Sequence, residues 1–264
     1  MNGFMKFDGL IRVYDSYVDG YRDPNGALPE MMQLKRIHTD YVVKNALSIA
    51  EGEAFDECAK EAALFAALLH DTGRYEQLKR YNTFRDSDSV DHAVFSHDIV
   101  EENGWLDSCP SKFRDAVLKA VLYHNRRDLP QGLDGLTLQT SHVVRDADKL
   151  DIFRVLEDLI DHTDWRKDSR AFWNLSISDP PSPNVIKAIE NRHPVDYQAI
   201  RSLSDFVLIQ VGWMVSDLHF PTARKLCAAR GHLSYRRELL HKLTNSTETD
   251  RVCSLAEASL ASAL

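Results

Sequence analysis

Residues 62–77, AALFAALLHDTGRYEQ, combine two kinds of sequence that seldom occur together. The first part is apolar on every side of a helix, which is typical of a segment buried at the centre of a protein. It ends in a histidine and an aspartate, His70 and Asp71, and Arg74 follows one helical turn later. Polar groups at the end of a buried helix are costly unless they are paired or bind a metal ion. The stretch therefore predicts a rigid central helix with functional side chains at its C-terminal end.

Helical periodicity continues through most of the chain. Between residues 30 and 51, apolar residues recur at spacings of three and four, so Met31, Leu34 and His38 are expected on one apolar stripe. The segment 72–88 is polar and broken, and no alternating strand pattern of useful length appears. We therefore predict an all-α helical bundle. The other expected helices span 4–19, 54–70, 89–103, 111–124, 138–162, 196–219 and 222–244.

The clearest interruption of the chain is SISDPPSPN, residues 176–184. Serine, proline and asparagine in such density are typical of a linker. We therefore expect residues 1–175 to form a helical domain that holds the functional residues. Residues 176–264 are expected to form a C-terminal helical extension packed on the same domain. For residues 213–232, a contribution to the substrate pocket or to a homodimer contact is the alternative role.

Composition restricts the classes of protein to consider. The chain has 264 residues, of which 44% are hydrophobic and 27% charged, as in ordinary globular proteins. The formal net charge of −8 argues against a nucleic-acid-binding surface, which is normally basic. No apolar window is long enough to span a membrane, the N-terminus lacks a secretory signal, and the four cysteines form no CxxC pair. We expect a cytoplasmic protein without membrane or nucleic-acid partners.

Four histidines and two aspartates lie on, or at the end of, expected apolar helices. Taken alone, each has an ordinary explanation: His38 would be a buried core histidine, and Asp148 would be a solvated carboxylate among acidic neighbours. Together they offer imidazole nitrogens and carboxylate oxygens, which suit divalent Mn, Fe, Ni, Co or Zn. The set is His38, His70, Asp71, His92, His124 and Asp148.

Six ligands exceed what one open metal site needs. A carboxylate shared between two ions would use all of them, and Asp71 is the natural bridge because it directly follows His70. Two-metal sites hold their ions about 3.5–4 Å apart, polarise a phosphoryl oxygen and generate hydroxide near neutral pH. We therefore expect two divalent ions. His97, five residues after His92, is the alternative ligand on its helix.

This ordered set resembles the HD-domain superfamily of metal-dependent phosphohydrolases, whose helical bundle carries the pattern H…HD…H…H…D. The resemblance covers roughly residues 30–165. The stretches HDTGRYEQ, SVDHAVFSHD, YHNRR and RDADKLD also look like a subgroup of uncharacterised bacterial HD proteins. The resemblance implies the following ligands: His38, His70, Asp71 and Asp148 for one ion, and His92 and His124 for the second, with Asp71 bridging.

Basic side chains beside these ligands are candidates for binding a substrate phosphate. Arg74 lies one turn after the His-Asp pair, and Lys149 directly follows Asp148. Any one of them alone is more often a solvated charge. An arginine fork or a lysine charge can nevertheless bind phosphate oxygens and offset charge that develops in a transition state. We predict Asp71, Arg74 and Lys149 as catalytic residues. The expected substrate contacts are Arg74, Asn125, Arg126 and Lys149.

The resemblance implies hydrolysis of a phosphate ester or anhydride by metal-activated water. The implied substrate is a nucleotide or another small phosphorylated metabolite. Mixed-valent di-iron oxygenases, inositol oxygenase among them, use the same fold and the same six-ligand pattern, and they are the first alternative. The second alternative is a non-catalytic nucleotide-binding module, against which the complete ligand set argues.

Overall fold

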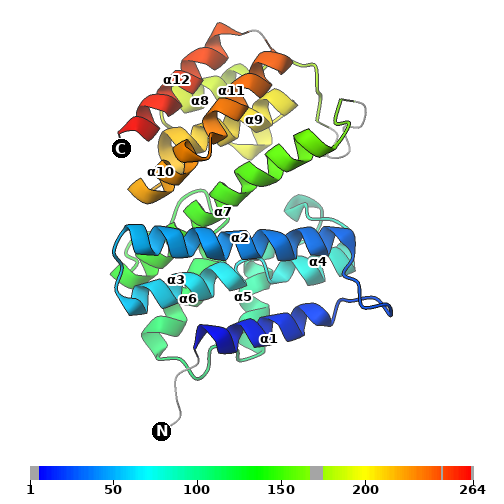
Figure 1. The fold of residues 1–264 in the computed structure, drawn as a ribbon, viewed down its shortest axis with the longest axis vertical. Helices are drawn as coiled ribbons and strands as arrows, with labels where there is room; N and C mark the ends of the chain where they lie inside the picture. Colours follow the sequence, from blue (N-terminus) through cyan, green and yellow to red (C-terminus); the bar gives the residue numbers. More distant parts are fainter. Residues whose placement is uncertain (1–5, 167–174, 245, 263–264) are drawn as a thin grey trace. The chain divides into compact units, whose positions relative to one another are not determined.

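The computed structural model describes residues 6–166, 175–244 and 246–262 (Figure 1). Within these ranges the chain is helical and has no β-strand; Ser176 and Ser202 form an isolated β-bridge. The predicted all-α fold is confirmed. None of the helices in the described ranges has the length and apolar character that crossing a membrane requires. The chain divides into two compact units, Met1–Asp148 and Lys149–Leu264.

The first unit is built around α3, the helix predicted from the apolar run. Ala62, Phe65 and Leu69 are fully buried in it, and Asp56 begins it by accepting a hydrogen bond from the Ala59 backbone N–H. Helices α1, α2 and α6 pack against α3, so it is the rigid support of the unit. The helices that begin in this unit are α1 (Phe7–Asp19), α2 (Glu30–Gly52), α3 (Glu57–Leu69), α4 (Gly73–Tyr81), α5 (His92–Glu102), α6 (Ser111–Tyr123) and α7 (Gly135–His162), with a short 3-10 helix η1 (Asp86–Asp88). The predicted helix 4–19 starts at residues that lie outside the described ranges.

Part of the expectation for residues 72–88 is wrong, because α4 forms within them. Its sequence is polar, yet Tyr75 and Gln77 are buried. Tyr75 packs its ring against those of Tyr14 and Tyr17, so contacts distant in sequence stabilise this helix. The helix ends at Asn82, which has the left-handed conformation and donates its backbone N–H to the carbonyl of Leu78.

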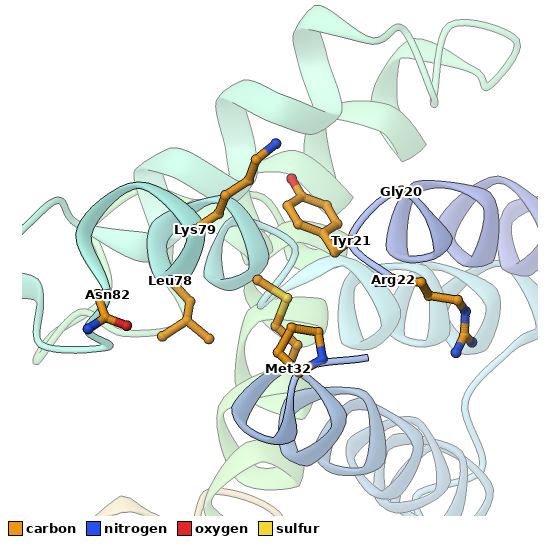
Figure 2. A pocket seen from close by; sticks show the side chains of 8 residues that line it. Gly20, Tyr21, Arg22, Met32, Leu78, Lys79 and Asn82 are labelled. Atoms are coloured by element: carbon orange, nitrogen blue, oxygen red, sulfur yellow. The ribbon is translucent and has the colours of Figure 1, made fainter. Parts of the chain in front are cut away.

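The expected apolar stripe on α2 is also partly wrong. His38 is buried as predicted, but Met31 and Leu34 are 46% and 39% exposed. Met32 is buried in their place and lines a surface hollow of about 420 Å³ (Figure 2). Leu78 lines the same hollow beside it. Which face of the first turns of α2 is buried therefore depends on the elements that cover the helix, and the spacing of apolar residues does not predict those elements.

The second unit contains the C-terminal half of α7 and all later elements. The expected helices 196–219 and 222–244 are each interrupted. The first is interrupted by extended residues and by a π-helical turn. The second is interrupted at Gly231, whose φ of +74° ends one helix before the next begins. The elements are α8 (Pro183–Glu190), η3 (Tyr197–Ala199), α9 (Leu203–Gly212), η4 (Trp213–Asp217), α10 (Pro221–Ala229), α11 (His232–Leu243) and α12 (Thr247–Ala261).

The two compact units divide inside α7, whereas the sequence analysis placed a boundary after residue 175. The physical reason is the packing of the C-terminal half of α7. The Phe153 ring lies 5.9 Å from that of Trp213 and 5.2 Å from that of His232, both in the second unit. That the residues after 176 pack on the first domain stays a prediction.

Candidate metal centre

All six predicted ligands belong to the first unit. His38 lies in the middle of α2, and the Asn45 amide on the same helix donates to the carbonyl of Ala147, which fixes α7 beside α2. The other ligands lie at helix ends or on α7, where the backbone is held by packing on both sides. Their positions are His70 and Asp71 directly after α3, His92 at the first residue of α5, His124 directly after α6, and Asp148 on α7.

One side of the cluster joins His38, His70 and Asp148 to Asp71. The Nε2 atom of His38 lies 3.1 Å from Oδ1 of Asp148. Oδ2 of Asp71 lies 3.6 Å from Nε2 of His38 and 3.5 Å from Nε2 of His70. The ligand atoms of His38, His70 and Asp71 all lie within 4.8 Å of one another. Their spacing fits a shared cation.

The other side joins His92 and His124 to the second oxygen of the same carboxylate. Oδ1 of Asp71 lies 3.6 Å from Nε2 of His92 and 3.9 Å from Nε2 of His124. These three ligand atoms also lie within 4.8 Å of one another. The two oxygens of Asp71 therefore face two different pairs of histidines, which is the arrangement that the sequence analysis expected of a bridging ligand.

The hydrogen bonds made by the Nδ1 atoms of His70 and His124 show that the other ring nitrogen, Nε2, carries a lone pair toward the cluster. The Nδ1 atom of His70 lies 2.8 Å from the carbonyl oxygen of Ala67, and that of His124 lies 2.7 Å from the carbonyl of Val121. A carbonyl oxygen can only accept, so each Nδ1 carries the hydrogen and each Nε2 carries a lone pair. Among the described residues, no hydrogen-bond partner satisfies the buried Nε2 of His70. Such a group is costly to bury, and a metal ion would satisfy it.

The Nε2 atoms of His92 and His124 also lie where a metal ion could bind. These atoms are only 3.0 Å apart. Burial, together with the nearby rings of His92 and His70, holds the pKa of His124 well below its usual range, so this ring is neutral near pH 7. Either one of these Nε2 atoms donates a hydrogen bond to the other, or both carry lone pairs whose repulsion a cation between them would offset. The donor set and its geometry therefore fit a divalent metal ion.

Positive side chains surround the shared carboxylate. Burial by itself raises the pKa of Asp71, but the positive charges of Lys35 and Arg74 lower it well below its usual range. The Nζ atom of Lys35 lies 2.6 Å from Oδ2 of Asp71. Lys35 is absent from the sequence prediction, although its place three residues before His38 on one helix is a signal that could have indicated it.

The residues predicted to bind substrate have different surroundings. Arg74 reaches the cluster, with Nε 3.4 Å from Oδ1 of Asp71. Asn125 and Arg126 contact opposite oxygens of the Asp91 carboxylate, at 2.8 and 3.2 Å. Lys149 belongs to the second unit, where its ammonium lies 5.8 Å from the centre of the Trp213 ring. Their roles toward a substrate stay predictions.

The structure distinguishes the two histidines of α5. His92 lies in the cluster, as described above. The Nδ1 atom of His97 lies instead 3.0 Å from the exposed carboxylate of its neighbour Asp98. The cluster therefore contains the residue that the sequence analysis preferred.

Asp86 is a residue of the site that sequence reasoning missed. Its Oδ2 atom lies 2.6 Å from Nδ1 of His92. Burial raises the pKa of Asp86, but the hydrogen bond from His92 and the charge of Arg74 lower it to about 2. Asp86 is one of several acidic residues in a polar segment, and nothing in the sequence pattern separates it from Asp88.

Gly73 fixes the distance between the start of α4 and the backbone of α5. A Cβ atom at this position would lie 2.7 Å from the backbone nitrogen of Ser96 and 2.9 Å from the carbonyl oxygen of His92. We expect Gly73→Ala to lower the free energy of unfolding by about 1–3 kcal/mol, because α5 must move to accept the methyl group. Urea unfolding measures this change.

Gly135→Ala is the matched control for that substitution. No atom lies within 4 Å of a Cβ built at Gly135, and the residue begins α7 without a positive φ. Its expected effect is smaller than about 1 kcal/mol in either direction. Equal effects of the two substitutions would contradict the close approach inferred at Gly73.

Comparison with known proteins identifies one family. The family model of the HD domain matches residues 36–153, a range that includes all six predicted ligands. No curated protein and no solved structure matches the chain.

Proposed function

The chain carries an HD domain over residues 36–153 and belongs to the HD-domain superfamily, and from this premise we propose that it is a metal-dependent phosphohydrolase. The superfamily implies a metal-dependent hydrolase. The bond broken in our proposal is a phosphate ester or anhydride, and the substrate is a nucleotide or another small phosphorylated metabolite. The observation that carries the proposal is that all six predicted ligands belong to overlapping groups of histidine and aspartate that could hold a metal ion.

We further propose that two ions bind. The support is the division of the Asp71 carboxylate, whose Oδ2 faces His38 and His70 while Oδ1 faces His92 and His124. Imidazole and carboxylate donors suit Mn, Fe, Ni, Co or Zn. Such ions, when bound, polarise a phosphoryl oxygen and bring the pKa of a coordinated water toward neutrality.

The side chains around the ligands have roles of their own in this proposal. Asp71 would supply one carboxylate oxygen toward each histidine pair and so would be a ligand of both ions. His70 and His124 keep their Nε2 lone pairs directed at the cluster, because each donates Nδ1–H to a backbone carbonyl. Arg74 and Lys35 place positive charge beside Asp71, where a substrate phosphate would be attracted. Lys149, Asn125 and Arg126 remain proposed substrate contacts.

Phosphate release from a panel of nucleotides and phosphorylated sugars, with each of the five metals, tests the proposal. We expect phosphate release that depends on the metal and falls more than about tenfold in His92→Gln. Substitution of a residue that only hydrogen-bonds a metal ligand already lowers activity by about 10–100-fold, and this variant loses a predicted ligand itself. The matched control is His97→Gln, five residues along the same helix, which should keep wild-type activity. The proposal fails if no substrate in the panel is hydrolysed with any metal, or if both variants lose activity equally.

A further inference from the structure

The ring of His92 is oriented differently from those of His70 and His124. The latter two donate Nδ1–H to the carbonyl three residues earlier, so the end of their own helix holds them. His92 starts its helix and has no preceding turn. Its Nδ1 atom lies instead 2.6 Å from Oδ2 of Asp86, six residues upstream on η1.

Asp86 is itself held by two side chains from α4. Its Oδ1 atom accepts hydrogen bonds from Nη1 of Arg74 and Nε2 of Gln77, both at 3.0 Å. Gln77 is fully buried, and its Nε2 also lies 2.9 Å from Oγ of Ser89 and 3.0 Å from the carbonyl of Val90. The carboxylate therefore has one oxygen committed to α4 and one directed at His92.

This arrangement decides which nitrogen of His92 carries the hydrogen. A carboxylate can only accept, so the hydrogen is on Nδ1 and the lone pair is on Nε2. Without Asp86, His92 would gain a hydrogen bond by moving its hydrogen to Nε2 and donating to Nε2 of His124, 3.0 Å away. In that tautomer Nε2 of His92 would have no lone pair for a metal ion, and the lone pair on Nε2 of His124 would accept the hydrogen bond, so this side of the cluster would be closed to a metal ion.

We propose that Asp86, held by Arg74 and Gln77, is a positioning residue that keeps His92 in the tautomer able to bind a metal ion. The proposal rests on the proposed function only in assuming that an ion binds at His92 and His124. Carboxylates that accept from the second nitrogen of a metal-binding histidine act in this way in other proteins.

The substitution Asp86→Asn tests it without changing the shape of the side chain. Arg74 and Gln77 both donate toward Oδ1, so the amide oxygen should take that place and the NH₂ group should face His92. A donor there favours the opposite tautomer. Asp88→Asn is the control, since Asp88 is on the same short helix and pairs with Arg85 at 3.4 Å.

Two measurements apply to the wild type and both variants, after removal of metal with a chelator. Nitrogen-15 NMR of the histidine rings gives the tautomer of His92, assigned by its loss in His92→Gln. We expect Nδ1–H in the wild type and Asp88→Asn, and Nε2–H in Asp86→Asn. Calorimetric titration with Zn²⁺ or Mn²⁺ should show about 10–100-fold weaker binding of one equivalent in Asp86→Asn only.

The tautomer decides the outcome even if no substrate is ever hydrolysed. An Nε2–H tautomer in the wild type would overturn the proposal, and so would an unchanged tautomer in a folded Asp86→Asn variant. Unchanged metal affinity in Asp86→Asn would also overturn it. A phosphate-release screen without a product would instead contradict the proposed function and leave these two readouts intact.

Discussion

Asp71→Ala is expected to lose bound metal altogether. The carboxylate contributes to both sides of the cluster, so its removal takes a ligand from each ion position. Substitution of residues that only hydrogen-bond a metal ligand already weakens metal binding about 10–100-fold. Loss of a ligand shared by two ions should weaken it more. Elemental analysis of protein purified without chelators measures the metal content of the wild type and the variant.

The control for this experiment is Asp98→Ala, an exposed carboxylate on α5 outside the cluster, which should keep its metal. Circular dichroism establishes that each variant is folded. One or two equivalents of Mn, Ni, Co or Zn, lost only in Asp71→Ala, would support the hydrolase. About two equivalents of iron would direct attention to the di-iron oxygenase and to oxygen-consumption assays. A folded wild type that takes up no metal after reconstitution would contradict the metal centre.

Arg236→Met is expected to destabilise the second unit strongly. Arg236 is fully buried, and its guanidinium lies 2.6 Å from Oε1 of Glu157 and 2.9 and 2.7 Å from Oε1 of Gln210. It also donates to the backbone carbonyls of Phe153 and His232. Methionine fills similar volume but leaves these acceptors without their donor, and the Glu157 carboxylate keeps, among the described residues, only the contact of its Oε1 with Nδ1 of His232 at 2.7 Å. Breaking a buried ion pair from one side costs about 3–5 kcal/mol.

Urea unfolding followed by tryptophan fluorescence checks this value, since Trp213 belongs to the same unit. The matched control is the adjacent residue, Arg237→Met. Arg237 lies on the surface and pairs with the exposed Glu257 at 2.8 Å, so we expect a change of about 1 kcal/mol or less. Similar losses in the two variants would show that the Arg236 network does not carry the stability assigned to it.

The helical fold and the six ligands could be predicted because their signals are local. The periodicity of apolar residues reports helices directly, and α3 occupies most of the predicted range. Each histidine or aspartate on an apolar helix has an ordinary explanation when taken alone, but six such costly placements together indicate a site. Their order along the chain then indicated one cluster, and the structure brings them together.

Features that depend on contacts between distant segments could not be predicted in this way. The polar sequence of α4 gives no helical stripe, and the helix is stabilised by Tyr75 against Tyr14 and Tyr17. Met31 and Leu34 fit the apolar spacing of α2 but remain exposed, because a helix buries only the face that another element covers.

The sequence alone therefore determined the chemistry of the site: which residue types meet, and that they lie on rigid helices. Only the tertiary structure decided how the donors are directed. The split of the Asp71 oxygens between two histidine pairs depends on the relative positions of the four helices α2, α3, α5 and α6. The contact of Asp86 with His92 depends on α4, which holds the preceding loop through Arg74 and Gln77. Distances of about 3 Å between side chains are set by packing, and packing is a property of the folded chain rather than of any segment of its sequence.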